Sequence, residues 1–285
     1  MPFVHLQHKI LRLTKAVIIF EGQGRGQLGK KLKSALTSKW IKTKVLMRSA
    51  EISPLIPETI KFSKVNLKAM LLKYGMVYVK PEYGTYGNGV MKVEQSREAH
   101  GTEYKYQSGT RLKTFRTFDA FHLSLKKATR GRSYLIQRGI VLLKHGKHRF
   151  DIRVMVQLSP QGKWETTGLI GRVAEKGKIV TNYHSGGKLT AMEKLLSPYL
   201  NEAQQAQMLK ILRKLGEDTG RFYHKKYPGF RQIGVDVGLD RSMTPWIIEV
   251  NTSPDPYIFK HLSDKSMYRK VMAYRRANEK KKSVK

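Results

Sequence analysis

Alternation between apolar and polar positions predicts most of the strands of this chain. At 246–251 the sequence runs Trp-Ile-Ile-Glu-Val-Asn, so Ile248 and Val250 point to one face of a strand and Glu249 and Asn251 to the other. Short apolar runs bounded by glycine, proline or polar residues predict further extended segments. These runs lie at 15–20, 57–62, 76–80, 90–95, 133–143, 148–158, 164–177 and 234–238.

Apolar residues at helical spacing, and long runs without glycine or proline, predict the helices between these strands. The helix predicted at 66–74 is followed directly by Gly75, and glycine favours a helix end. We expect helices at 31–50, 66–74, 117–129, 201–221 and 261–285. The apolar face of the fourth is expected to contain Ala203, Ala206, Leu209 and Leu212 or Leu215. The stretch 94–112 is polar and is predicted to be irregular, with an exposed hairpin at 102–115. This mixture predicts an α+β fold.

The charge balance is the strongest feature of the composition. The 285 residues contain 55 Lys and Arg but 21 Asp and Glu, which gives a formal net charge of +34. Such a charge attracts polyanions, including nucleic acids, acidic polypeptides and nucleotides. No zinc-finger spacing or RNA-binding aromatic strand is visible. The absence of cysteine excludes disulfides and thiol chemistry, and no apolar run is long enough to span a membrane, so we expect a cytoplasmic protein.

Carboxylate and amide side chains near the C-terminal end of the chain predict a cation site. If the strands at 234–238 and 246–251 pair through a turn at 240–244, Asp236 joins Glu249 and Asn251. These side chains provide the hard oxygen ligands that Mg²⁺ prefers. The alternative is a strand whose polar residues face solvent.

Two glycine-rich stretches are candidates for anion binding. The first has Gly-x-Gly-x-x-Gly spacing at 24–29, but Lys31 stands where a P-loop needs Ser or Thr, so we interpret it as a mobile or anion-binding loop. The second follows Lys80 at the end of a predicted strand and contains Gly84, Gly87 and Gly89. Its backbone N–H groups could close over phosphate oxygens beside a lysine. An ordinary hairpin with a glycine-rich turn is the alternative.

The strand at 148–158 places Asp151 and Arg153 on one face and apolar residues on the other. An arginine within a sheet is either exposed or directed at an anion. Arg172 lies near the end of the next predicted strand, and a loop at 180–190 follows it. We interpret His184 in this loop as a polar loop residue, because it has no metal-ligand spacing with other residues.

Taken in order, these features resemble the ATP-grasp superfamily, and within it the YheC/YheD group of endospore coat-associated proteins. The resemblance covers roughly residues 38–256 and is carried by SKWIKTKVLMRSAEISPLIPET, VYVKPEYGTYGNGV, YLIQRGIVLL, RFDIRVMVQ and GVDVGLDRSMTPWIIEVNTSPD. The phrases DIRV and EVNTSP are also similar to glutamate-adding RimK-type ligases. A departure is the short segment, about 37 residues, that precedes the matching region.

The resemblance implies two α+β subdomains that hold ATP between them. The implied boundaries are a short N-terminal segment at 1–37, subdomains at 38–136 and 137–258, and a basic tail at 259–285. The resemblance implies Mg²⁺ or Mn²⁺ at Asp236, Glu249 and Asn251, and Arg153 near the γ-phosphate. It places ATP against Lys39 (with Lys42 as the alternative), Lys80, Gly84, Gly87, Gly89, Gln137, Arg138 and Ile140. It assigns substrate or acyl-phosphate contacts to Arg172, Asn182, Gly186, Gly187 and Lys188.

The activity implied is ATP-dependent ligation of a carboxylate to an amine through an acyl phosphate. The positive charge suggests an acidic amino acid, peptide or protein as substrate. A non-catalytic, nucleotide-binding protein of the spore coat is the second hypothesis. A nucleic-acid binder is the third, and it rests on the charge alone.

Overall fold

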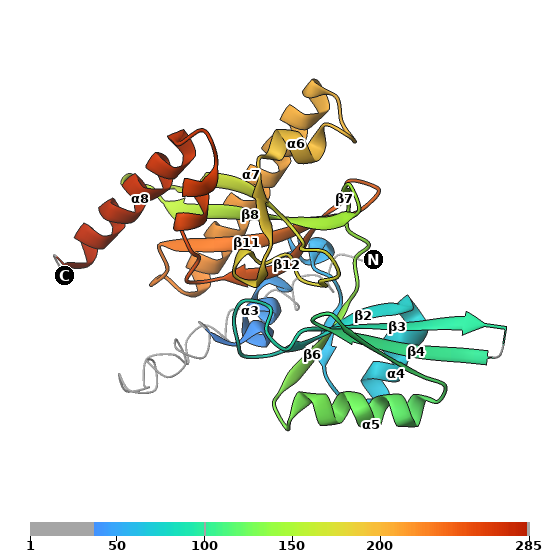
Figure 1. The fold of residues 1–285 in the computed structure, drawn as a ribbon. Helices are drawn as coiled ribbons and strands as arrows, with labels where there is room; N and C mark the ends of the chain where they lie inside the picture. The colour runs from blue at the N-terminus through green and yellow to red at the C-terminus, as the bar shows by residue number, and fades with distance from the viewer. Residues whose placement is uncertain (1–36, 100, 284–285) are drawn as a thin grey trace, which may run out of the picture. The chain divides into compact units, whose positions relative to one another are not determined.

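The computed structural model describes residues 37–99 and 101–283, which form two antiparallel sheets with helices packed against them (Figure 1). The predicted strand at 15–20, the glycine loop at 24–29 and the start of the predicted helix at 31–50 lie outside these residues. Among the described helices, none combines the length and apolar character that crossing a membrane requires.

The first sheet carries two helices on one face. Its strands, in spatial order, are β1 (Thr59–Lys61), β6 (Tyr134–Arg138), β2 (Met76–Pro81), β3 (Met91–Glu98), β4 (Gly101–Ser108) and β5 (Arg111–Phe115). Helices α4 (Lys64–Tyr74) and α5 (Phe118–Thr129) bury Leu67 and Phe121 in the same apolar cluster as Val77 and Val93 of the sheet. The opposite face of β2 and β6 is therefore left for the site described below.

The second sheet is covered on both faces. Its order is β10 (Lys188–Thr190), β9 (Trp164–Val173), β8 (His148–Leu158), β11 (Gln232–Leu239) and β12 (Pro245–Asn251), and β7 (Lys144–His145) also pairs with β8. Helix α7 (Glu202–Lys226) lies over the face that holds Val154 and Val156. The turn η3 (Tyr257–His261) and helix α8 (Ser266–Ser283) cover Met155 and Gln157 on the other face. The short helix α6 (Met192–Leu196) packs on β9.

Two glycines allow α7 to lie close to this sheet. A Cβ on Gly216 would lie 2.7 Å from Val154 Cγ1, and one on Gly220 would lie 2.6 Å from the Trp164 ring. Glycine inside a helix costs about 1 kcal/mol relative to alanine, so the close packing has to offset that loss. The helix starts with a capping box formed by Asn201 and Gln204.

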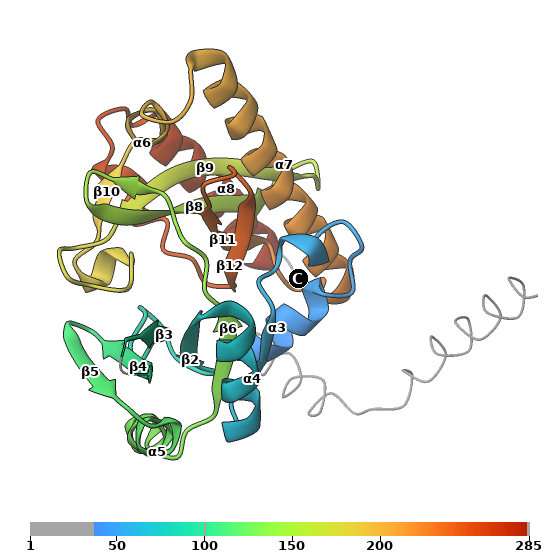
Figure 2. The same cartoon turned by 90° about the vertical axis from the view of Figure 1, so that its right-hand side faces the viewer.

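Helix α3 (Lys39–Leu46) packs against elements of the second sheet. It contacts α7 and β12 and is followed by the turn η1 (Ser53–Leu55) (Figure 2). The Ser38 side chain caps its N-terminus by accepting a hydrogen bond from Ile41 N–H. Lys39 and Lys42 therefore start from the first turns of a helix that lies beside β12.

Several expected boundaries differ from the structure. The helix expected at 31–50 ends at Leu46, where turns begin. The stretch expected to be irregular begins inside β3, and the hairpin that follows is β4 and β5. Residues 188–190 form a strand instead of a loop, because they pair with β9. The strand expected at 164–177 ends at Val173, and the C-terminal helix begins at Ser266.

The prediction of which residues form the apolar face of 201–221 is partly wrong. Ala203 and Ala206 are exposed, whereas Leu212 and Leu215 are buried as expected. The buried face extends instead toward the C-terminus to Tyr223, because this end of α7 crosses the sheet. The extended run expected at 133–143 is a strand only as far as Arg138. The other helix and strand predictions agree with the observed elements to within a few residues.

Candidate functional site

The β11–β12 hairpin brings the three expected metal ligands together. Asp236 pairs in register with Glu249, and Asn251 pairs with Gly234 two positions along the same strands. Asn251 Nδ2 donates a hydrogen bond to Asp236 Oδ2 at 3.1 Å. The turn between the strands is closed by Asp240, whose carboxylate accepts hydrogen bonds from the N–H groups of Ser242 and Thr244. A register shift between Asp236 and Val237 lies between this turn and the two aligned carboxylates.

Two arginines and a second aspartate surround Asp236. Arg153 Nε lies 2.5 Å from Asp236 Oδ1, and Arg172 Nη2 lies 3.0 Å from Asp236 Oδ2. Arg172 also donates two hydrogen bonds to Asp151, at 2.8 and 2.6 Å. All four side chains are buried. Burial alone would raise the pKa of Asp236, but the two arginines outweigh it and lower that pKa to about 2.

The glycine-rich hairpin lies over these carboxylates. Its loop, together with Lys39, Asn182, Asp236, Glu249 and Asn251, lines a single cavity. Gly87 and Gly89 have φ values of +74° and +76°, which favour glycine. A Cβ on Gly87 would also lie 2.9 Å from Asn182 Nδ2. The loop can approach the 182–187 segment closely because it lacks that side-chain atom.

Two contacts hold the loop in this position. Lys39 Nζ donates a hydrogen bond to Gly84 O at 2.6 Å and lies 3.3 Å from Glu249 Oε1. Ser185 Oγ donates to Tyr86 O at 2.7 Å. One contact comes from α3, which packs against β12, and the other from the loop before β10, so residues on the side of the second sheet hold the hairpin of the first sheet.

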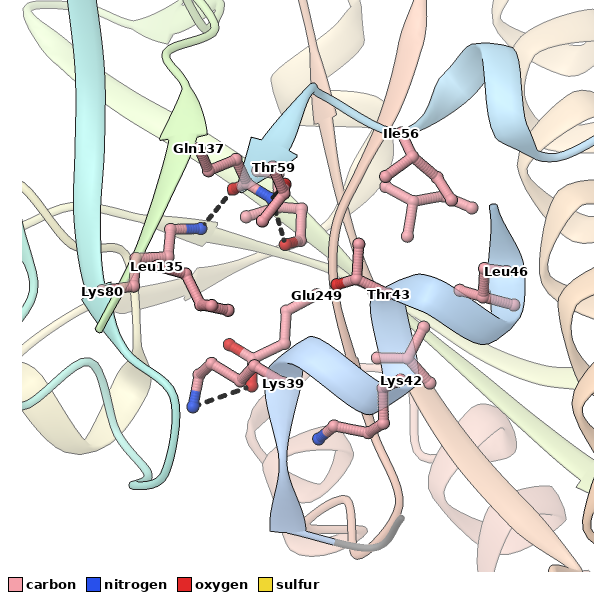
Figure 3. Close-up of a pocket in the computed structure, with 13 residues that line it drawn as sticks. Lys39, Lys42, Thr43, Leu46, Ile56, Thr59, Lys80, Leu135, Gln137 and Glu249 are labelled. Atoms are coloured by element: carbon pink, nitrogen blue, oxygen red, sulfur yellow. Dashed lines mark hydrogen bonds and ion pairs between the residues drawn. The ribbon is translucent and has the colours of Figure 1, made fainter. Parts of the chain in front are cut away.

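Lys80 and Gln137 join the two sheets at the centre of the site (Figure 3). The Lys80 ammonium donates to Gln137 Oε1, and Gln137 Nε2 donates to Thr59 Oγ1 at 3.1 Å and to Ile248 O at 3.3 Å. Burial lowers the pKa of Lys80 to about 8, although Glu249 acts in the opposite direction. A cavity next to this pair is lined by Tyr78, Gly87, Ile140, Leu142, Asn182, Arg172, Asp236 and Ile248. It combines apolar walls at one end with charged groups at the other, as a nucleotide requires.

Some of the remaining expected contact residues line this cavity and others do not. Ile140 lines the cavity, and Asn182 both lines it and accepts a hydrogen bond from Arg172 Nη1 at 3.3 Å. Arg138 does not line it: its guanidinium lies 4.8 Å from the centre of the Trp246 ring, and its backbone N–H donates to Glu58 O. Lys188 is exposed on β10.

Gly186 and Gly187 shape the loop before β10 and do not line the cavities described above. Gly186 has φ +90°, and a Cβ on Gly187 would lie 2.1 Å from Thr181 O. His184 in the same loop has a partner, because its Nε2 lies 3.2 Å from Asp255 Oδ2. Its ring also meets Tyr86 edge-on, with the ring centres 4.5 Å apart.

Glu82 is a buried residue that the sequence analysis did not single out. Its carboxylate accepts hydrogen bonds from Ser38 Oγ, Ser133 Oγ and Lys61, and its backbone O accepts one from Lys39 N–H at 3.0 Å. These bonds outweigh burial and lower the pKa of Glu82. Glu82 thus ties the start of the glycine loop to α3. Its position directly after Lys80-Pro81 was the available signal.

The donor set at the hairpin fits a hard divalent cation. Asp236, Glu249 and Asn251 offer carboxylate and amide oxygens to the same cavity. Within residues 37–99 and 101–283 no cluster of three or more His, Cys, Asp or Glu could hold a metal. The fit therefore depends on the amide of Asn251 and on oxygens that a bound phosphate would add.

Comparisons with known proteins show what this chain is similar to. The family model described as "YheC/D like ATP-grasp" matches residues 30–276. The endospore coat-associated protein YheD of Bacillus subtilis (strain 168) is 26% identical over 231 residues, which are 79% of this chain and 49% of YheD. YheC of the same organism is 24% identical over 220 residues, 77% of this chain and 60% of YheC. This chain therefore spans about half of YheD and about three fifths of YheC.

A solved structure is also similar. D-alanyl-alanine synthetase A from Vibrio cholerae O1 biovar eltor str. N16961 has 14% identity and a TM-score of 0.49, over 85% of this chain and 66% of that one. Because the family model spans most of the sequence, this chain belongs to the YheC/D-like ATP-grasp family.

Proposed function

We propose that the chain is an ATP-dependent ligase that joins a carboxylate to an amine through an acyl phosphate. The observation that carries the proposal is the cavity beneath the glycine loop, where Lys39, Asp236, Glu249 and Asn251 meet. Cationic side chains and oxygen donors placed together suit a triphosphate and its divalent cation. Membership of an ATP-grasp family supports the same assignment.

The chain's own residues bind and orient the nucleotide in this proposal. The apolar walls around Ile140 and Ile248 accept the base, and Lys80 lies where the phosphates would begin. The glycine loop covers the phosphates and excludes water. Asp236, Glu249 and Asn251 would hold Mg²⁺ or Mn²⁺, which would supply positive charge to offset that of the phosphates.

The arginines stabilise the charge that develops during transfer. An oxygen of the substrate carboxylate attacks the γ-phosphorus, and ADP leaves. An amine then attacks the acyl carbon, and inorganic phosphate leaves with the bonding electrons. Arg153 and Arg172 are the fixed cations next to the metal ligands, so they would neutralise the repulsion between carboxylate and phosphate. Asn182, bonded to Arg172, would orient the transferred group.

The net charge of +34 favours an acidic substrate, such as glutamate or an acidic peptide. The relatives named endospore coat-associated proteins motivate a second part of the proposal, that this ligase acts on or near the spore coat.

The test is calorimetric binding of ATP with and without Mg²⁺, with Glu249→Gln as the variant. Glu249 is preferable to Asp236, because Asp236 also neutralises two buried arginines and its loss would affect folding. Glu94→Gln is the matched control, since Glu94 lies on β3 and pairs with Lys92 outside the cavity. We expect Mg²⁺-dependent ATP binding that only Glu249→Gln weakens. Equal binding by both variants would contradict the metal assignment.

Turnover separates the ligase from its alternatives. ADP release that requires an acidic amino acid or peptide together with an amine supports the ligase. ATP binding that no carboxylate or amine converts to turnover would favour a nucleotide-binding coat protein. Tight, salt-sensitive DNA binding without any ATP binding would favour the nucleic-acid hypothesis.

A further inference from the structure

A groove runs along strand β9 on the side of the second sheet away from β8. Strand β10 pairs with β9 only at 171–173, so the earlier part of this edge has no neighbouring strand within the described ranges 37–99 and 101–283. A cavity of about 260 Å³ lies along the edge at 166–169. The residues that form its walls are Arg213 of α7 and Ser266, Met267 and Lys270 of α8. The groove shares no lining residue with the cavities described above.

One backbone N–H group at this edge has a weak hydrogen-bond partner. Leu169 N–H donates to Met267 Sδ at 3.2 Å, and a thioether is a weak acceptor. The carbonyl oxygen of an added strand would be a stronger one. Thr167 has no partner in the register of β8 with β9, because the pairing shifts at this point. This bulge limits an added strand to a few backbone bonds, so charge has to supply much of its affinity.

The charged side chains that line the groove are both positive. Arg213 and Lys270 are exposed and form no ion pair with any residue that the structure describes, whereas Lys214 and Arg275 on the same two helices are paired with carboxylates. Arg213 comes from the helix on one face of the sheet and Lys270 from the helix on the other. Successive side chains of a strand point to opposite faces. Two adjacent acidic residues on an added strand would therefore meet one cation each.

We propose that this groove docks an acidic, extended segment of a polypeptide substrate, which adds to the edge of β9 and pairs adjacent carboxylates with Arg213 and Lys270. Addition of an extended peptide to a sheet edge is a common mode of recognition. Leu169 and Arg172 are three residues apart on one strand, about 10 Å, so the docked segment lies near the proposed site of transfer. The inference rests on the proposed function and names an acidic polypeptide as its substrate class.

The binding test uses two blocked, rhodamine-labelled peptides of the same composition. Thr-Val-Glu-Glu-Val-Thr places its carboxylates on both faces of a strand, and Thr-Glu-Val-Glu-Val-Thr places them on one face. Fluorescence anisotropy at low salt compares the wild type with two double variants. The groove variant is Arg213→Gln with Lys270→Met. The control variant is Lys225→Met with Arg276→Gln, which removes exposed cations of the same helices that do not line the groove.

The expected affinities follow from the number of ion pairs that each combination can form. The wild type and the control variant should bind the first peptide about threefold more tightly than the second, because only the first reaches both cations. The groove variant should bind the first peptide about tenfold more weakly than the wild type does. Equal affinities of the wild type for the two peptides, or of the wild type and the groove variant for the first peptide, would overturn the inference.

Turnover separates this inference from the proposed function. With an acidic polypeptide as substrate, the groove variant should raise KM about tenfold and leave kcat unchanged, and the KM for free glutamate should stay the same. A KM that rises equally for free glutamate would overturn docking at the groove and leave the ligase in place. Peptide binding that the groove variant weakens, in a protein that does not bind ATP, would overturn the proposed function and support the groove as a binding surface for acidic peptides.

Discussion

The pH dependence of Lys80 offers a test in which stability and ligand affinity change in opposite directions. Its ammonium is largely buried and has the neutral amide of Gln137 as a hydrogen-bond acceptor. Desolvation therefore exceeds the attraction of Glu249 and lowers the pKa of Lys80 from 10.5 to about 8. Between pH 8 and 10.5 the Lys80 side chain is therefore mostly protonated in the unfolded chain and mostly neutral in the folded chain.

The sign and size of the effect follow from this difference. Because the unfolded state binds more protons between pH 8 and 10.5, the free energy of unfolding rises with pH in that window. A difference of 2.5 pKa units corresponds to at most about 3.4 kcal/mol, and water that reaches part of the side chain reduces it. Phosphate binding requires the protonated form. At pH 9 about one tenth of Lys80 would be protonated, so ATP affinity should fall about tenfold.

The assay combines urea unfolding at pH 7 to 10 with ATP calorimetry at pH 7 to 9. Lys80→Met removes the titrating group, and Lys126→Met, an exposed position on α5, is the control. The wild type and Lys126→Met should gain stability relative to Lys80→Met as the pH rises, and should lose ATP affinity. If Lys80→Met shows the same pH dependence as the wild type in both measurements, the assignment of a depressed pKa to Lys80 is refuted.

Further substitutions test the packing around the site. Gly87→Ala should weaken ATP binding more than tenfold, whereas Gly109→Ala, also at positive φ but with open space around it, should lose only about 1 kcal/mol of stability. Arg172→Met should lower the free energy of unfolding by about 3–5 kcal/mol in urea titrations, because it leaves buried carboxylate charge without a partner. Leu212→Ala should cost about 2–5 kcal/mol by the same measurement, and its more exposed neighbour Ile211→Ala less than about 1 kcal/mol.

The sequence predicted strands and helices well where one physical signal dominated. Alternation at 246–251 and at 148–158 predicted both strands and placed Glu249 on the same side as Asn251. Ile248, expected on the face opposite Glu249, instead lines a cavity with it, because the pairing of β11 with β12 shifts register at this point. Gly75 ends α4 with φ +67°, as expected for a helix end. The start of the apolar face of 201–221 was wrong because helical periodicity does not reveal where a neighbouring sheet begins.

The contacts of the site were harder to predict than its residue types. Asp151 was noted by its position on a strand, but its pairing with Arg172 depends on the alignment of β8 with β9. Glu82 has three side-chain donors that are far apart in the sequence, so no local pattern identifies them. Likewise, the side chain of Arg138 turns toward Trp246, a contact made across the two sheets. Such long-range pairing appears only once the fold is known.

The balance of charge in the site indicates how its ligands depend on one another. Asp236 is paired with two arginines and Glu249 with Lys39, so both carboxylates are already neutralised before any ligand binds. A divalent cation alone would have to displace these partners and would leave the released cations in a buried site without anions. A triphosphate supplies the missing negative charge, because its oxygens can accept the hydrogen bonds of the same arginines and lysines. The cation and the nucleotide should therefore each raise the affinity of the site for the other by the same factor.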